Sequence, residues 1–105
     1  MNLNQIQMRI KDKYYETDES SGPLFLLAVL FEEVGELAEA VRKEDKPEIQ
    51  QELTDVLFMT LSIANLFRVE LQDNIREKYI EGDPRSRWDL PSNTKESQAR
   101  KKSPE

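Results

Sequence analysis

Two long segments of the sequence place apolar residues at helical spacing, and this spacing leaves few folds open to the chain. In residues 23–43 and 47–67 apolar residues recur every three or four positions, whereas the alternation typical of β-strands is nearly absent. Each segment begins with a proline, which suits the first turn of a helix. Because only Glu44–Lys46 separates the segments, we predict an all-α helical bundle built on two long antiparallel helices.

Shorter helices are predicted on both sides of this pair. The first covers Leu3–Tyr15 and is followed by a polar turn at Glu16–Gly22, and the last covers Leu71–Glu81 and stops at Gly82. Residues 89–105 contain too few apolar side chains to bury, so we expect one helical domain at residues 1–88 followed by a disordered polar tail.

Composition excludes several classes of function. The net charge of −6 makes the chain a poor partner for nucleic acid, although metal ions would allow it to bind a phosphate-bearing small molecule. The absence of cysteine and histidine removes thiolate sites and the commonest general base. The longest apolar run, Leu24–Phe31, is too short to cross a membrane, and Met1–Arg9 does not resemble a signal peptide. We therefore expect a soluble, cytoplasmic protein with no membrane partner.

Acidic residues interrupt the apolar stripes of both long helices. The stripe on the second helix consists of Leu26, Val29, Glu33, Glu36 and Ala40, and the stripe on the third of Glu52, Asp55, Met59, Ile63 and Leu66. A separate apolar face of the second helix is expected to form its core face: Leu24, Leu27, Phe31, Val34, Ala38 and Val41.

The four acids are predicted to meet in space. In an antiparallel pair, Glu36 and Asp55 both lie about 14 Å from the turn, with Glu33 near 19 Å and Glu52 near 10 Å. Partly buried carboxylates without a basic partner must be protonated or bind a cation. An all-oxygen donor set favours Mg²⁺ or Mn²⁺, and the lack of histidine argues against a di-iron bundle. The alternative, a solvated acidic face, suits a single pair of acids better than two matched pairs.

The acidic pattern also resembles a known family. Glu32-Glu33-Val34-Gly35-Glu36 followed by Glu52-Leu53-Thr54-Asp55 resembles the EExxE…ExxD signature of MazG-like nucleotide pyrophosphohydrolases, and the resemblance covers Leu24–Trp88. It implies an all-α fold completed by oligomerisation. It also implies hydrolysis of a nucleoside triphosphate to the monophosphate and pyrophosphate, which would serve nucleotide-pool housekeeping.

The resemblance implies roles for individual residues. Glu33, Glu36, Glu52 and Asp55 would be the Mg²⁺ ligands, Glu32 would support the site or orient water, and Glu33 or Glu36 would accept a proton from that water.

Further substrate contacts are expected outside the acidic pattern. Lys78 and Arg87 are candidate phosphate contacts, with ordinary surface charge as the alternative. Trp88 is interpreted either as a stacking partner for the base or as an aromatic that pins the chain end. Asn65 is interpreted either as a contact to the base or as a surface asparagine.

Two other functions remain open at the level of sequence. Phosphoribosyl-ATP pyrophosphatase of histidine biosynthesis has the same carboxylate chemistry, and a helical interaction module would have none. A homo-oligomer, either a dimer or a dimer of dimers, is expected in each case because the second helix is apolar around most of its circumference.

Overall fold

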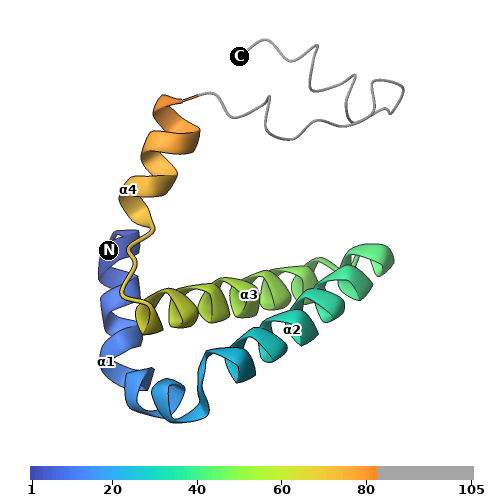
Figure 1. Ribbon diagram of the computed structural model, residues 1–105. Coiled ribbons are helices and arrows are strands. Elements are labelled where there is room, and N and C mark those ends of the chain that lie inside the picture. Colours follow the sequence, from blue (N-terminus) through green and yellow to red (C-terminus); the bar gives the residue numbers. More distant parts are fainter. Residues whose placement is uncertain (83–105) are drawn as a thin grey trace. The chain divides into compact units, whose positions relative to one another are not determined.

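The computed structural model describes residues 1–82, which form helices joined by short turns (Figure 1). The helices are α1 (Leu3–Ser21), α2 (Pro23–Lys43), α3 (Lys46–Leu66) and α4 (Gln72–Ile75), and α4 continues into a π-helix at Arg76–Glu81. No strand occurs in the described part of the chain, so the predicted all-α fold is confirmed. Within the same part, no helix is both long enough and apolar enough to span a membrane. Contacts divide the chain into two compact units, Met1–Leu71 and Gln72 onward.

The predicted antiparallel pair is α2 and α3, which lie side by side in Figure 1. The chain reverses at Glu44, whose φ of 55° is left-handed and whose N–H donates to the Val41 carbonyl at 3.0 Å. Asp45 then caps α3, because its side chain accepts from the Glu48 N–H at 3.3 Å. This tight turn fixes the register between the two helices and therefore the relative heights of their acidic residues.

The first helix is longer than predicted. The expected turn at Glu16–Gly22 is wrong, because α1 continues to Ser21 and the chain turns at Gly22 alone. Gly22 has φ 91° and ψ 154°, and its N–H donates to the Asp18 carbonyl at 2.9 Å. The polar residues Glu16–Ser21 include no glycine or proline, so they can stay helical. Gly22 alone provides the change of direction.

The expected core face of α2 is also wrong. Leu24, Phe31 and Val41 are 79%, 66% and 52% exposed within the single chain. The stripe that carries the acids packs inward, with Leu26 and Ala40 buried. Both stripes have intervals of three and four residues, either of which can form a seam between two nearly parallel helices, so the spacing alone does not decide which stripe faces α3. The wider apolar face is left uncovered.

The other end of the hairpin is closed by α1, which lies across it where α2 begins and α3 ends (Figure 1). The Tyr14 and Phe58 rings meet edge to face at a centroid distance of 5.0 Å. The buried apolar core of the described residues is small and centred on α3: Leu26, Ala40, Met59, Leu61 and Ala64. The predicted fourth helix exists at Gln72–Glu81, although most of it has π geometry, which its sequence did not indicate.

Candidate metal centre

Three of the four predicted acids converge between α2 and α3. Glu33, Glu36 and Glu52 each offer a carboxylate oxygen, and these oxygens lie within 4.8 Å of one another. Glu33 and Glu36 are one turn apart on the inward stripe of α2, and Glu52 faces them from the first half of α3. The helical period and the tight turn at Glu44 thus suffice to bring the three carboxylates together.

The environment of this carboxylate cluster is unfavourable for negative charge. Glu33 and Glu52 are half-buried, and the Oε1 atom of each is buried without a hydrogen-bond partner. Partial burial raises the pKa of the Glu52 carboxyl to about 7, and the neighbouring Glu33, Glu36 and Asp55 carboxylates push it in the same direction. The cluster therefore holds more negative charge than its own surroundings stabilise.

No basic residue compensates for the cluster within residues 1–82. The ion pairs of that part of the chain join Arg42 and Lys43 to Glu39, and Arg76 to acids of its own helix. Carboxylates that cannot all ionise together are either partly protonated or neutralised by a bound cation. The oxygen-only donor set and the two buried oxygens without partners fit a hard cation such as Mg²⁺.

Asp55 lies beside the cluster but outside the group of three. Its half-buried carboxylate accepts two long hydrogen bonds, of 3.4 and 3.5 Å, from the Gln51 amide. The charge of Asp55 is nevertheless close enough to contribute to the raised pKa of Glu52. Glu32, the first acid of the motif, is exposed on α2.

The remaining predicted contacts are more dispersed. Lys78 is half-buried in the π-helix, with its ammonium 5.5 Å from the centre of the Tyr79 ring. Arg87 and Trp88 lie outside the described residues, so that nothing is added here to their predicted roles.

Asn65 is not a surface residue, and that interpretation is wrong. Its side chain is only 6% exposed, and the carboxamide is paired with Gln7 of α1. Gln7 is not among the residues predicted from the sequence, although its position on the helix gives a signal. Leu3, Gln7, Ile10 and Tyr14 form a stripe with the same spacing as the acid-bearing stripes, and Gln7 is its one polar member.

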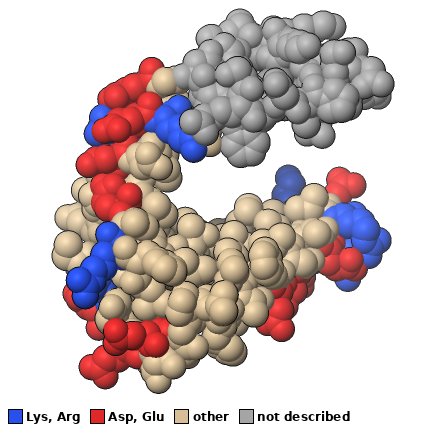
Figure 2. All heavy atoms as spheres, in the orientation of Figure 1, with Lys and Arg blue, Asp and Glu red and all other residues tan. Residues whose placement is uncertain are grey.

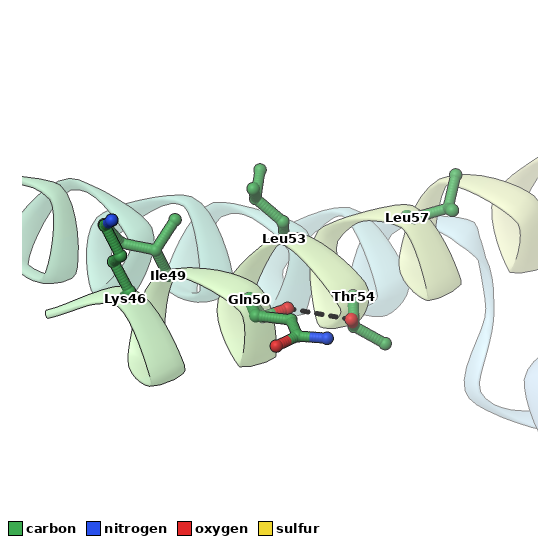
Figure 3. A pocket seen from close by; sticks show the side chains of 6 residues that line it. All are labelled: Lys46, Ile49, Gln50, Leu53, Thr54 and Leu57. Carbon is green, nitrogen blue, oxygen red and sulfur yellow. Dashed lines mark hydrogen bonds between the residues drawn. The ribbon is translucent and has the colours of Figure 1, made fainter.

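An open groove of about 390 Å³ lies on another side of α3 (Figure 3). Ile49, Leu53 and Leu57 project from the helix on the same side, while Gln50 and Thr54 point elsewhere and Thr54 donates to the Gln50 carbonyl at 2.8 Å. None of the four acids lines this groove. Its apolar wall is consistent with a contact surface. The carboxylate cluster is therefore the better candidate for a site that binds a metal ion.

Comparison with known proteins shows the family of the chain. Residues 21–86 match the family model of the MazG nucleotide pyrophosphohydrolase domain. This match covers more than half of the chain and includes both acid pairs. No curated protein matches the sequence.

Proposed function

Because the chain belongs to the MazG nucleotide pyrophosphohydrolase family, we propose that it hydrolyses a nucleoside triphosphate to the monophosphate and pyrophosphate with Mg²⁺ as cofactor. Ribo- and deoxyribonucleotides are both candidate substrates, and Mn²⁺ is a candidate substitute for Mg²⁺. Such a reaction in the cytoplasm would serve nucleotide-pool housekeeping.

The observation that carries this proposal is the carboxylate cluster. Glu33, Glu36 and Glu52 share a space within 4.8 Å, two of their oxygens are buried without partners, and no basic side chain of residues 1–82 pairs with them. A protein that used these residues only for packing would gain stability by replacing them with apolar residues. Their presence on an inward seam is explained if they bind a cation that in turn binds phosphate.

In the proposed reaction each residue has a defined task. Glu33, Glu36, Glu52 and Asp55 would hold Mg²⁺, and a bound Mg²⁺ would supply positive charge for the triphosphate and lower the pKa of water. Glu32 orients the attacking water, and Glu33 or Glu36 accepts its proton. The water oxygen bonds to the α-phosphorus while the bond to the bridging oxygen of the leaving pyrophosphate breaks. Lys78 and Arg87 contact the phosphates.

We further propose that the protein is a homo-oligomer, a dimer or a dimer of dimers. The apolar face of α2 is uncovered, and exposed apolar residues also occur on α3, where Leu53 and Leu57 are 51% and 48% exposed and line the groove of Figure 3. The side of the hairpin seen in Figure 2 is mostly uncharged, with its charged groups gathered at the ends and along the lower edge. A second copy would remove this surface from water.

The reaction is tested by incubating the protein with Mg²⁺ and each common nucleoside triphosphate and separating the products by anion exchange. We expect monophosphate and pyrophosphate, no product in EDTA, and a loss of more than roughly 10²-fold in Glu36→Gln. Glu39→Gln is the matched control, because Glu39 is on the same helix but is exposed and paired with Arg42 and Lys43. Diphosphate plus phosphate would leave the metal centre in place and refute the bond assignment.

A second experiment separates the enzyme from a non-catalytic helical module. If the cluster binds Mg²⁺, the melting temperature of the wild type rises as Mg²⁺ is added. At a hundred times the Kd, the free energy of unfolding increases by about 2.7 kcal/mol. Glu36→Gln should lose this response and Glu39→Gln should keep it. A melting temperature indifferent to Mg²⁺ in all of them would refute the metal centre. A Mg²⁺ response without turnover of any common triphosphate would make phosphoribosyl-ATP the substrate to test next.

A further inference from the structure

A cavity within the unit Met1–Leu71 is lined by residues of α1 and of the end of α3. Its volume is about 300 Å³, which is at the lower end of the range of small-molecule pockets. The residues that line it are Asn4, Gln7, Met8, Lys11, Asn65 and Glu70. None of the four acids of the candidate metal centre belongs to this lining, so the cavity is a separate feature of the same unit.

Two nearly buried amides form part of the lining. Gln7 and Asn65 are 7% and 6% exposed, whereas the apolar members of the Gln7 stripe, Leu3, Ile10 and Tyr14, are only half-buried. A helix usually buries apolar residues most deeply, because a buried amide must find hydrogen-bond partners to offset its lost hydration. The reason for amides at these two positions therefore lies in the groups that they bind.

The two amides hold each other in one orientation. The Gln7 Nε2 donates to the Asn65 Oδ1 at 3.1 Å and to the Val69 carbonyl at 2.8 Å, which uses both of its hydrogens. The Asn65 Nδ2 donates one hydrogen to the Gln7 carbonyl at 3.1 Å. Within the described residues, this arrangement leaves the Gln7 Oε1 as an acceptor and the second Asn65 N–H as a donor.

The acceptor has no donor within residues 1–82. The Gln7 Oε1 is buried and makes no hydrogen bond there, and an unsatisfied buried acceptor costs free energy. An N–H group of a ligand in the cavity would offset that cost. Because the spare donor belongs to the paired Asn65, the ligand that suits both amides carries an N–H and an acceptor next to each other.

The charge of the lining favours a neutral ligand over a phosphate. Lys11 and Glu70 are the charged residues that line the cavity, and their formal charges cancel. The Lys11 ammonium lies 5.6 Å from the centre of the Tyr15 ring, and the Glu70 carboxylate accepts from the Asn4 amide at 3.3 Å. Met8, which is 63% exposed, adds an unbranched apolar side chain that can adapt to the face of a flat ring.

We propose that this cavity binds the base of the nucleotide substrate. Gln7 accepts from an N–H of the base and Asn65 donates to the neighbouring acceptor, as paired amide groups do when they recognise the edge of a base. The Met8 side chain moves to admit the ring to the buried Gln7 oxygen. This inference rests on the proposed function, to which it adds the residues that select the base.

The distance between the cavity and the metal centre suits one nucleotide. Asn65 follows Asp55 by ten residues on α3, which corresponds to about 15 Å along the helix axis. The side chains of both residues reduce the distance that the ligand has to cover. An extended nucleoside triphosphate, with the base at one end and the phosphates at the other, is long enough to reach both places.

Nuclear magnetic resonance tests the contact without requiring activity. Adenosine, guanosine, cytidine and uridine are each added to the isotope-labelled full chain in EDTA, so that neither a phosphate nor a metal contributes to binding. At least one nucleoside should shift the side-chain NH₂ signals of Gln7 and Asn65 in a saturable way. The signal of Gln5, whose side chain caps α1, should stay unchanged. Shifts at neither Gln7 nor Asn65, or equal shifts caused by inorganic phosphate, would overturn the inference.

Gln7→Leu removes the proposed acceptor and should raise KM by about 10-fold for the preferred triphosphate, with kcat changed little. The differences in KM between triphosphates should also become smaller, because the lost hydrogen bond selects the base. Gln5→Leu is the matched control, since it also removes hydrogen bonds of α1 but lies outside this cavity. Its KM should stay within about 2-fold of the wild type. Equal KM values in the two variants would contradict the role of Gln7.

Inorganic tripolyphosphate distinguishes a base contact from a general effect on the fold, because it has the phosphates of the substrate but no base. Its inhibition constant should be the same in wild type and Gln7→Leu. A weakening of tripolyphosphate as large as the increase in KM would show that Gln7 acts on the metal centre or the fold, and would overturn the inference.

Failure of the proposed function would be visible separately. A wild type that turns over no triphosphate would refute the reaction, whereas saturable shifts of Gln7 and Asn65 would still show that the cavity binds a base. Turnover without such shifts would refute the base site and leave the proposed reaction intact.

Discussion

At the scale of single residues, the protonation state of Glu52 is coupled both to the stability of the fold and to the proposed binding of a cation. Its carboxyl has a pKa of about 7 in the folded chain, because of burial and the three acids around it, against an ordinary value of 4.5. The folded state therefore keeps the Glu52 proton over a pH range in which the unfolded state has released it. A cation that binds the cluster must displace this proton.

This linkage predicts the pH dependence of stability in EDTA. Since the folded pKa is raised, the contribution of Glu52 to stability is greatest below about 4.5, falls as the pH rises to about 7, and stays low above that. The metal-free wild type should thus melt at a lower temperature at pH 8 than at pH 5.5. Glu52→Gln should show a flatter profile, and Glu39→Gln should follow the wild type. If the melting temperatures of wild type and Glu52→Gln depended on pH in the same way, this would contradict the raised pKa of Glu52.

Mg²⁺ should reverse this trend. Because protons compete with the cation for Glu52, the stabilisation by a fixed Mg²⁺ concentration should be larger at pH 8 than at pH 5.5. Melting curves with and without Mg²⁺ at the two pH values measure this difference. A larger stabilisation at the lower pH would place the cation elsewhere.

The acids could be predicted from the sequence because a charged residue on an apolar stripe is costly and therefore conspicuous. The same rule applied to Gln7, but an amide carries no charge and a single polar residue on a stripe is common. The partner of Asn65 could not be predicted, since the two residues are 58 positions apart and meet only through the way α1 crosses α3.

At the scale of helices and turns, Gly22 has a role that no other residue could fill easily. Its φ of 91° with ψ of 154° belongs to a region that is almost restricted to glycine, and a Cβ built there meets no atom within 4 Å. A substitution therefore introduces backbone strain without a steric clash.

Gly22→Ala should lower the free energy of unfolding by roughly 1–3 kcal/mol. The matched control is Ser21→Ala, one residue earlier, where the backbone is helical and the side chain is exposed, so the change should stay within about 0.5 kcal/mol. Denaturant titrations in the presence of EDTA measure both. Equal stabilities of the two variants would show that the turn relaxes to accommodate alanine.

The bounds of α2 and α3 agree closely with the periodicity and the two prolines, whereas α1 was predicted to end six residues too early. Glu16–Ser21 contains residues that favour turns as well as helices, so its composition does not decide between these states. The π geometry of Arg76–Glu81 has no sequence signature of its own.

At the scale of the whole molecule, periodicity showed that α2 has two apolar faces but not which one packs within the chain. Both faces have helical spacing, and each was expected to pack. A single chain uses the seam that its own α3 can cover. The wider face, with Phe31 at 66% exposure, is left uncovered in a single chain, and this exposure supports the proposed oligomer.

Phe31→Asp should therefore dissociate the oligomer without unfolding the chain. Phe31 lies on the uncovered face, so a carboxylate there meets only water in a monomer but must be desolvated in an interface. The wild type should sediment as a dimer or larger at micromolar concentration and Phe31→Asp as a monomer of equal helical content. Met8→Asp, at a residue of α1 that is 63% exposed, is the control and should keep the assembly. A monomeric wild type would refute the oligomer. It would also mean that water contacts the α2 face directly and that each carboxylate cluster works within one chain.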